Sequence, residues 1–369
     1  MTQDFNSSPL FQNIEIARRK KTKIKDSIIT LAHGSGGKAT HELINSLFLE
    51  YLSNPILEKL EDQATLEINS PNSKTKLAFT TDSFVVDPIF FPGGDIGKLA
   101  VYGTVNDLAM SGATPLYLSA SFILEEGFPI KDLKQIVKSM QKAAQEAQIQ
   151  IVTGDTKVVQ KGSADKIFIT TSGIGIIDLP LQISSTQAQV GDKIIVSGTV
   201  GDHGTTILIA RGDLELEAEI ESDTAPLNLL VKDMLDEALQ IGNLEAIHCL
   251  RDPTRGGIAT TLNEIALSSN KYIEIYQKNI PIREEVHGAC EILGLDPLYV
   301  ANEGKLIAIV SNDLAERLLE RIRRNPLGKD AAIIGEVKEE PSAIVALVTN
   351  FGSTRIVDML VGEQLPRIC

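Results

Sequence analysis

Cysteine is scarce in this chain of 369 residues, and its scarcity excludes several kinds of protein. The three cysteines, Cys249, Cys290 and Cys369, are odd in number and widely spaced, so they fit neither a disulfide framework nor a CxxC metal knuckle. No apolar run approaches the roughly 18–20 residues of a membrane span, and no signal-peptide pattern begins the chain. We therefore expect a soluble protein of the reducing cytoplasm.

Positive charge is also in short supply, since 35 basic residues face 49 acidic ones and the formal net charge is −14. This balance disfavours sequence-independent binding to phosphate backbones and excludes a typical nucleic-acid reader. The first 25 residues differ, with six basic and two acidic side chains. We predict that this basic arm, residues 1–27, is a solvated tail; contact with an acidic partner is the alternative.

Strand-like apolar runs alternate with segments of helical period through most of the chain. Strands are predicted at residues 28–32, 77–81, 116–124, 149–154, 166–177, 193–198, 272–276, 305–310 and 331–337. Helices are predicted at residues 41–52, 96–110 and 130–147, after Gly204, and around 227–239 and 257–267. The turn-rich stretch 179–192 separates the two sets. We expect an amino-terminal domain over residues 28–180, a carboxy-terminal α/β domain over 181–350 and a flexible tail over 351–369.

Short acidic motifs lie near strand ends or on helices beside glycine-rich turns, where a folded domain gathers side chains into one cleft. They contain Asp62, Asp82, Asn106 with Asp107, Asp155 with Lys157, and Asp252. Gathered carboxylates need a cation, and Mg²⁺ commonly bridges one or two carboxylates to nucleotide phosphates. The five histidines show no HExxH spacing, so the pattern favours a Mg-ATP site over a transition-metal site. Taken singly, each aspartate is better explained as a turn or helix cap.

Glycine turns that precede helices could bind the phosphate groups of ATP at such a site. One is the segment 33–38, which holds Gly36, Gly37 and Lys38, and two others are residues 92–95 and 201–204. Backbone N–H groups at a helix amino terminus bind anions without any special side chain. The GxxxxGK[ST] and GxGxxG patterns are both absent, so the common nucleotide-binding folds are not supported.

Longer motifs extend from about Ile28 to the last residue. They include HGSGGKAT, LAFTTDSFVVDPIFFPGGDIGKLAVYGTVNDLAMSGATP, FILEEGFP, IVTGDTKVVQKG, VSGTVGDHGTTIL, RDPTRGGIAT, ANEGKL, NPLGKDAAIIGEV and the terminal LPRIC. Together they closely resemble the HypE family of hydrogenase maturation factors, which are carbamoyl dehydratases, and the terminal PRIC is the most specific element. That family belongs to the superfamily of aminoimidazole ribonucleotide synthetase and selenophosphate synthetase.

The resemblance implies an α+β, two-domain PurM-like fold. In this fold the N-terminal sheet forms a barrel across a homodimer, and a C-terminal α/β domain follows. ATP is expected between the domains and the dimer-facing sheet, together with Mg²⁺. The implied partners are the carbamoyltransferase HypF and the HypC–HypD complex, without nucleic acid or membrane.

The resemblance also implies a reaction at Cys369. In the family, the terminal cysteine accepts a carbamoyl group from HypF as an S-carboxamide, and ATP-dependent dehydration then gives a thiocyanate. Its cyanide passes to the iron of a [NiFe]-hydrogenase through HypC–HypD. Phosphorylation turns the amide oxygen into a leaving group, and a base then removes the nitrogen proton. A terminal position lets the sulfur visit a partner's site and its own, and Arg367 would favour its thiolate form.

The resemblance assigns further residues of this chain. The expected base of the dehydration is Glu303, and the expected cation that stabilises charge is Lys157; an ordinary surface pair is the alternative. The expected Mg²⁺ ligands are Asp62, Asp82, Asp107 and Asp252, and Asp62 departs from the superfamily pattern because it follows Glu61. The residues expected to contact ATP are Asn106, Asp155, Gly36, Gly37 and Lys38. His203 fits helix capping as well as catalysis, and Cys249 and Cys290, in apolar stretches of helical period, are expected in the core.

Two other functions compete with the dehydratase. A small-molecule kinase or synthetase of the same superfamily, such as a thiamine-monophosphate kinase, would keep the Mg-ATP cleft but has no use for a terminal thiol. A non-catalytic carrier would present a carbamoylated Cys369 to partners and would not need Asp82 or Asp107. The terminal PRIC motif, with its cysteine as the last residue, favours the dehydratase.

Overall fold

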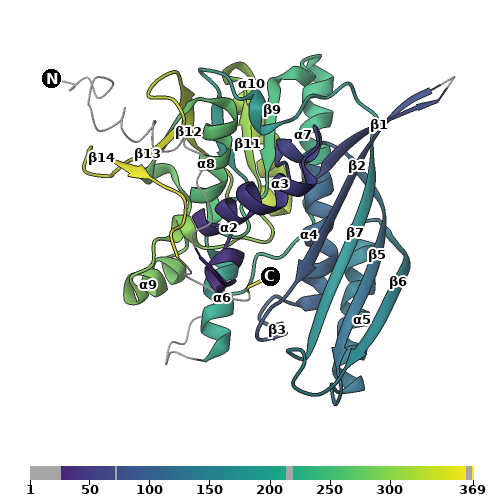
Figure 1. The fold of residues 1–369 in the computed structure, drawn as a ribbon. Helices are drawn as coiled ribbons and strands as arrows, with labels where there is room; N and C mark the ends of the chain where they lie inside the picture. Colours follow the sequence, from purple (N-terminus) through teal and green to yellow (C-terminus); the bar gives the residue numbers. More distant parts are fainter. Residues whose placement is uncertain (1–25, 71–72, 213–218, 363–367) are drawn as a thin grey trace.

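The computed structural model describes residues 26–70, 73–212, 219–362 and 368–369, and the predicted basic arm lies almost entirely outside them. The chain builds two large sheets, one from each half of the sequence (Figure 1). Helices pack beside both sheets, which confirms the predicted α+β class. None of the helices in the described residues is long and apolar enough to cross a membrane.

The first sheet has five strands in the order β1-β2-β7-β5-β6. They are β1 (Ala64–Ser70), β2 (Ser73–Phe84), β5 (Thr114–Glu125), β6 (Gln150–Val159) and β7 (Ile167–Ile177). Neighbours are antiparallel except β5 and β6, which run parallel and are joined by α5 (Ile130–Glu146). Two short strands, β3 (Phe90–Phe91) and β4 (Gly94–Asp95), precede α4 (Ile96–Met110). Helices α4 and α5 lie on the same side of this sheet (Figure 1).

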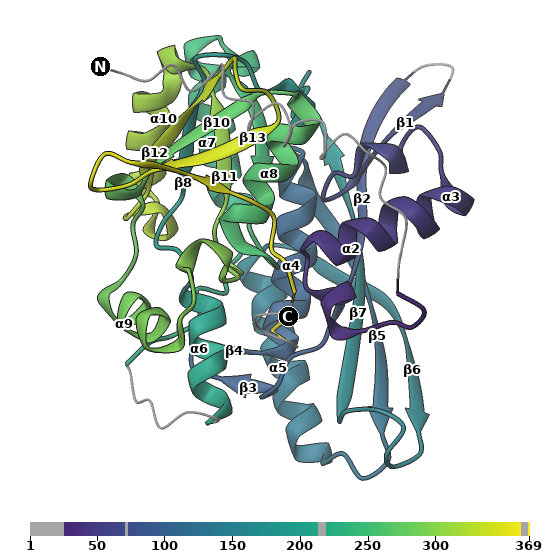
Figure 2. The same cartoon turned by 60° about the vertical axis from the view of Figure 1, so that its left-hand side comes forward.

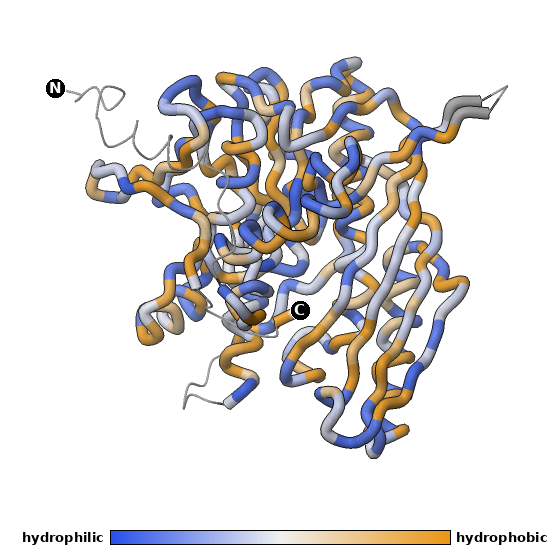
Figure 3. The backbone as a smooth tube through the Cα atoms, in the orientation of Figure 1, coloured by the Kyte–Doolittle hydropathy of each residue, from blue (hydrophilic) through white to orange (hydrophobic). Residues whose placement is uncertain are grey.

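Alternation along its strands gives this sheet one buried and one exposed face. On β2, Thr80 and Phe84 are buried on the side of α4, whereas Phe79 is 42% exposed. Residues paired across strands share a face, so Ile174 on β7 and Tyr117 on β5 continue the exposed row of Phe79. Hydrophobic residues recur along these strands (Figure 3). The sheet therefore presents an apolar outer face that no helix covers in the described part of the chain (Figure 1).

Helix α4 connects the two halves of the molecule. Asp95 caps it by accepting hydrogen bonds from the N–H groups of Gly97 at 2.7 Å and Lys98 at 3.0 Å. Nearly all its residues are buried, because it packs against β2, β7, α5 and α7 (Asn228–Ile241). This wedged position gives a rigid base to Asn106 and Asp107 in its last turns.

The second sheet has seven strands in the order β14-β13-β10-β12-β8-β11-β9. They are β8 (Lys193–Val196), β9 (Ile247–Arg251), β10 (Tyr272–Tyr276), β11 (Ile307–Val310), β12 (Ala332–Lys338), β13 (Ile344–Val348) and β14 (Thr354–Val357). Its other helices are α6 (Asp202–Arg211), α8 (Gly257–Ser269), α9 (Glu284–Leu293) and α10 (Asn312–Arg324). One face of the sheet shares a core with α7, α10 and the end of α4, and the opposite face shares a core with α8.

Two predicted elements differ from the structure near the start of the described chain. The strand predicted at residues 28–32 is wrong, because Thr30 begins the short helix η2 (Leu31–Gly34) by hydrogen bonding to His33 Nδ1. The helix predicted at residues 41–52 is present but interrupted, as α2 (Lys38–Leu43), η3 (Ile44–Phe48) and α3 (Leu49–Leu52).

Other elements were not predicted, namely β1, β3, β4, β9, α10, β13 and β14, whereas the helical period expected around Cys290 is present as α9. Strand β14 lies inside the segment predicted as a flexible tail and pairs with β13, so the regular fold continues to Val357. Cys249 and Cys290 are both buried, as predicted. Cys249 nevertheless lies on β9 rather than on a helix, because a short apolar run that is buried on both faces has no distinctive period.

Candidate active site at the end of the chain

The end of the chain lies inside the molecule, beside α4 and α6 (Figures 1 and 2). Ile368 pairs with Val86 in an isolated antiparallel bridge, and the Val85 N–H donates to the Cys369 carbonyl at 2.8 Å. The Ile368 side chain is buried in the same apolar cluster as Phe84. The last two residues therefore dock as a short strand just beyond the end of β2.

The Cys369 thiol lies near Arg255, Glu303 and Asp82. Burial raises the pKa of this thiol; Arg255 acts in the opposite direction, and Glu303 and Asp82 add to the rise. Burial at this position therefore opposes a thiolate more than Arg255 favours one, and Arg367, on which the expectation of a thiolate rested, lies outside the described residues. The pocket suits a neutral sulfur substituent better than an anion.

Glu303 is a buried carboxyl on a tightly fixed loop. Its N–H donates to Asp223 Oδ1 at 3.0 Å, and the Lys305 ammonium group donates to Asp223 Oδ2 at 3.1 Å. At Gly304, a Cβ atom would lie 1.8 Å from the Asp223 carbonyl oxygen, so only glycine fits there. Burial raises the pKa of Glu303 well above its ordinary value, with further contributions from Asp252, Asp223 and Asp82, and its Oε1 has no hydrogen-bond partner in the described residues. The loop thus aims a proton acceptor at the chain end.

The four predicted metal ligands are gathered at one place. Burial raises the pKa of Asp107 well above its ordinary value, and repulsion from Asp252, Asp82 and Asp62 raises it further. Burial likewise raises the pKa of Asp252 to about 6, although Arg251 opposes the rise. These carboxylates repel one another without enough local positive charge, so the cluster suits a bound cation.

Asp62 differs from the other three. Its Oδ1 lies 2.7 Å from Arg251 Nε, and Arg251 also pairs with Glu264 at 2.8 Å. His41 lies 2.9 Å from the same glutamate. Asp62 is thus part of an ion-pair network between the two halves of the chain. Its role as a metal ligand stays a prediction.

The described residues contain no set of three or more acidic, histidine or cysteine side chains already arranged around a metal position. A complete protein cage for a metal is therefore not present among them. Mg²⁺ rarely needs one, since it keeps waters and is commonly held by one or two carboxylates together with substrate phosphates. Asp82, Asp107 and Asp252 fit this open arrangement.

The glycine segment packs against the returning end of the chain. The Lys38 N–H donates to the Leu360 carbonyl at 2.8 Å, and a Cβ on Gly37 would lie 2.3 Å from that oxygen. Gly36 has φ +75° and lies against the backbone of Arg255. The glycines permit this close packing, and their contact with ATP stays a prediction.

Asn106 is fully used by backbone groups. Its Nδ2 donates to the Ala225 carbonyl at 3.1 Å and to the Glu303 carbonyl at 3.4 Å, and its Oδ1 accepts from the Leu227 N–H at 2.8 Å. The amide therefore holds the Glu303 loop against α4. Contact with a phosphate stays a prediction that would require this network to open.

Asp155 and Lys157 lie apart from the other predicted site residues. They form an exposed ion pair of 2.6 Å on the edge strand β6. Asp82 is paired through β7 and β5 with Gly154, so Asp155 and Lys157 point to the opposite face of the sheet. Three strand spacings, about 14 Å, separate β2 from β6. Within one chain the structure does not bring this pair to Cys369.

Arg255 was not singled out by sequence reasoning. It follows Asp252 in the RDPTRGG motif, just before α8, and its Nη1 lies 3.3 Å from the Gly34 carbonyl. The pKa of Arg255 is raised chiefly by Cys369, and Asp82 and Glu303 contribute. Arg255 therefore supplies positive charge to both the thiol and the carboxylates within the described part of the chain. The sequence signal that could have identified Arg255 was its place three residues after Asp252, a predicted metal ligand.

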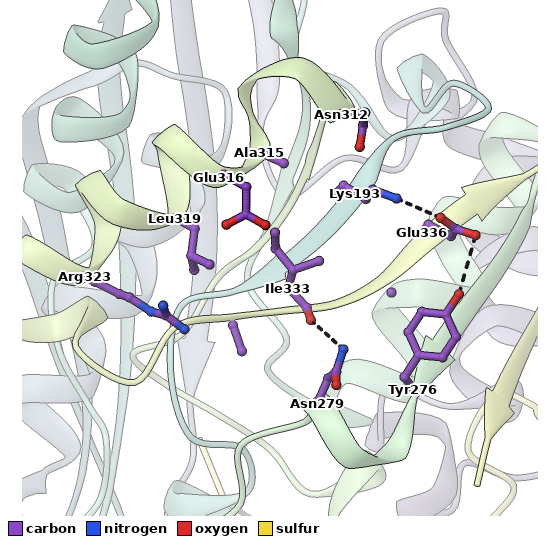
Figure 4. A pocket seen from close by; sticks show the side chains of 12 residues that line it. Lys193, Tyr276, Asn279, Asn312, Ala315, Glu316, Leu319, Arg323, Ile333 and Glu336 are labelled. Carbon is purple, nitrogen blue, oxygen red and sulfur yellow. Dashed lines mark hydrogen bonds and ion pairs between the residues drawn. The ribbon is translucent and has the colours of Figure 1, made fainter. Parts of the chain in front are cut away.

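Two cavities lie away from Cys369. One, of about 490 Å³, lies between α10 and the second sheet, where Lys193 pairs with Glu336 at 2.7 Å (Figure 4). The other, of about 700 Å³, is lined by residues that include Ser222, Asp223 and Lys305. The second cavity adjoins the Glu303 loop through Asp223 and Lys305, but the lining of neither cavity includes Cys369, Glu303 or a predicted metal ligand.

Comparison with protein families gives two matches. The model described as AIR synthase related protein, N-terminal domain, matches residues 60–177, and that described as AIR synthase related protein, C-terminal domain, matches residues 189–348. The first range contains the five-stranded sheet, and the second contains most of the seven-stranded one.

Individual relatives match over nearly the whole chain. Carbamoyl dehydratase HypE of Azotobacter vinelandii is 52% identical over 346 residues, which cover 94% of this chain and 98% of the relative. A solved structure of HypE in complex with ATP is 50% identical, with a TM-score of 0.75, and covers 93% of this chain and 100% of its own. A HypE–HypF complex is 49% identical, with a TM-score of 0.80, and the corresponding shares are 86% and 99%.

Proposed function

Since the chain belongs to the HypE family of carbamoyl dehydratases, we propose that it uses ATP to convert an S-carboxamide on Cys369 into a thiocyanate. The observation that carries this proposal is the docking of the last residue beside Glu303 and the gathered carboxylates. A kinase that acts on a free small molecule would not use Cys369, so its reaction would not explain why the chain end docks here. The product would supply the cyanide ligand of [NiFe]-hydrogenase iron.

The reaction divides into two steps that this site can support. The carboxamide oxygen attacks the γ-phosphorus of ATP, ADP leaves, and the nitrogen releases its first proton to water. The C–O bond then breaks, the oxygen departs with inorganic phosphate, and Glu303 removes the second nitrogen proton as the C≡N bond forms. No oxidant or reductant is needed. The raised pKa of Glu303 makes its carboxylate a stronger base than a free one.

The gathered carboxylates would hold Mg²⁺, with Asp82, Asp107 and Asp252 as the ligands. When bound, the ion would neutralise phosphate charge and align the γ-phosphate. Arg255 lies close enough to Cys369 and Asp82 to stabilise negative charge that develops on the transferred group. The docked backbone of Ile368 and Cys369 would hold a carboxamide on the Cys369 sulfur near Arg255 and near the gathered carboxylates.

The chain end would accept the carbamoyl group in a released position, not in the docked one. A buried thiol with a raised pKa is a poor nucleophile, because the thiolate is the reactive form. The end of the chain would therefore leave the cleft to meet a carbamoyl donor, for which HypF is the proposed partner, since a relative forms a HypE–HypF complex. The proposed receiver of the cyanide is the HypC–HypD complex.

We extend the proposal to a homodimer that completes the site. The exposed row of Phe79, Ile174 and Tyr117 needs a cover, and a second copy would cover it as the predicted barrel. Lys157 and Asp155, which face the same side, would then serve the Cys369 site of the partner subunit. This arrangement explains why one chain keeps Lys157 apart from Glu303.

Mass spectrometry of the C-terminal peptide tests the dehydration directly. Cys369 is first converted to the S-carboxamide with cyanate, and Mg-ATP is then added. Loss of one water mass from this peptide, together with ADP formation, is the expected result, and Cys369→Ser provides the control. An S-carboxamide that stays intact while ATP is bound would instead favour a carrier. ATP turnover on a free small molecule by the Cys369→Ser protein would favour a kinase.

A further inference from the structure

His203 is a buried histidine that the proposed chemistry does not use. It follows the first residue of α6 and has no exposed surface. Its Nε2 lies 2.5 Å from the Ile368 carbonyl oxygen, and its Nδ1 lies 2.7 Å from Ser222 Oγ. The imidazole therefore links the end of the chain to the loop before α7.

The partners of the ring define its tautomer. A carbonyl oxygen only accepts, so Nε2 carries the hydrogen and donates it to Ile368. Burial lowers the pKa of His203, so the ring is neutral and Nδ1 accepts from the Ser222 hydroxyl. Because Ser222 has spent its one hydrogen, Thr224 donates to Ser222 at 2.5 Å. The hydrogen bonds run in one direction, from Thr224 through Ser222 and His203 to the chain end.

An aromatic contact also holds the imidazole of His203 in place. Phe91 meets it edge to face, with ring centroids 5.6 Å apart and an interplanar angle of 82°. The Ser222 N–H donates to the Pro92 carbonyl at 3.0 Å, so the serine that orients the ring is itself anchored. A donor held this firmly loses little entropy when the chain end docks against it.

We propose that His203 is a positioning residue that retains the end of the chain in its docked position through the hydrogen bond from Nε2–H to the Ile368 carbonyl. It acts on Cys369 through the backbone and touches no reacting atom. Among the described residues, the docked end is also held by the Val85 N–H, by the buried Ile368 side chain, and by contacts of the Cys369 thiol with Glu303 and Arg255. His203 supplies a side-chain hydrogen bond to the backbone of this end, so a substitution can remove it without changing Glu303 or Arg255. The balance between docked and released tails thus depends on this residue.

The rate at which Cys369 reacts with a thiol reagent measures this balance without any reference to catalysis. Removal of the donor in His203→Asn, whose amide is too short to reach, is expected to speed alkylation of Cys369 about two- to tenfold. His203→Gln places an amide N–H near the position of Nε2 and should restore a rate close to that of the natural chain. Ser222→Ala, which removes the group that orients the ring, should give a smaller increase.

The buried Cys249 and Cys290 provide the internal control, since their alkylation follows opening of the fold. A Cys369 rate unchanged in His203→Asn would overturn the proposal, as would a His203→Gln protein that reacts as fast as His203→Asn. If His203→Asn also speeds alkylation of Cys249, the fold has opened and the test uses Ser222→Ala instead. An unchanged rate of Cys369 alkylation in Ser222→Ala would then count against the proposal. Because dehydration is not measured, failure of the proposed function would leave these results intact.

Discussion

At the scale of single residues, the site depends on carboxyl groups that are kept from water. Glu303 and Asp107 both have raised pKa values because they are buried near other acids, yet they are expected to do different work. Glu303 lies near the thiol and is suited to accept a proton, whereas Asp107 lies among the carboxylates that suit Mg²⁺. Their surroundings, rather than their chemical type, separate a base from a metal ligand.

Replacement of Glu303 by glutamine should slow dehydration about 10²- to 10⁴-fold, because the amide cannot take the nitrogen proton. Binding of ATP should persist. In the natural chain the rate should rise with pH as Glu303 loses its proton, with a midpoint well above the pKa of about 4.3 of a free glutamate. Single-turnover mass spectrometry across pH measures both effects. Glu291→Gln, at an exposed glutamate on α9, is the control, and equal loss of activity there would contradict the assignment.

Replacement of Asp107 by asparagine should abolish dehydration but stabilise the ligand-free protein at neutral pH, because the neutral amide removes a buried charge that Asp252 and Asp82 repel. The raised pKa means that the folded state disfavours the charged form, so stability falls as pH rises from about 4, the unfolded value, through the folded one. The gain should therefore vanish near pH 4. Thermal unfolding at both pH values tests this, with the exposed Asp330→Asn as control. A lower melting temperature for Asp107→Asn at neutral pH would show that repulsion is not the dominant effect.

The sequence identifies many residues of the candidate site, but it does not show which contacts each of them makes. Motif resemblance selected Cys369, Glu303 and the four aspartates, and the structure gathers them. It could not show that Asp62 pairs with Arg251, because that contact joins segments nearly two hundred residues apart. Nor could it show that burial opposes a thiolate at Cys369, since burial is a tertiary property.

At the scale of elements, short loops with little freedom set the geometry. The Glu303 loop is held by Asp223, Asn106 and Lys305, and its glycine allows the backbone of residue 223 to approach. The chain end docks beyond β2 with two residues only. Rigid loops of this kind can keep a base in place while the substrate arrives on a movable segment.

Substitution of Gly304 by alanine should destabilise the protein by about 2 kcal/mol or more and strongly reduce dehydration, because the added Cβ would overlap the Asp223 carbonyl. Gly288→Ala offers a matched control, since a Cβ at this position on α9 meets no atom within 4 Å. There the better helix propensity of alanine should stabilise by up to about 1 kcal/mol. Chemical denaturation compares the two variants. Similar stabilities for both would contradict the close-packing argument.

The sequence identified most elements, and the failures have physical causes. Strand β14 is four residues long and follows a turn, so its alternation is too brief to detect. Helix α10 could have been found, because Leu314, Leu318 and Ile322 recur at helical spacing and are all buried. The register that turns Lys157 away from Asp82 depends on how β6 pairs with β5, which no local pattern reveals.

At the scale of the whole molecule, the described part of one chain leaves the apolar outer face of the first sheet uncovered and keeps Lys157 apart from the other predicted catalytic residues. The apolar row and Lys157 lie on the same outer side of this sheet, where Phe79, Ile174 and Lys157 are exposed. A second copy would bury the apolar row and would bring its own β6 edge. The proposed homodimer therefore links assembly to activity.

Mixing two inactive variants tests whether Lys157 acts across the dimer. Lys157→Ala retains Cys369, and Cys369→Ser retains Lys157, so each homodimer should fail to form thiocyanate. In a mixed dimer, the Cys369 of one copy would meet the Lys157 of the other, and random exchange should restore about a quarter of the natural activity. Sedimentation of each variant confirms that dimers form and exchange. If Lys157 instead served its own chain, every mixed dimer would carry two broken sites. Activity that stays at zero in a mixture of proven dimers would thus exclude action in trans and leave Lys157 without a route to the buried thiol.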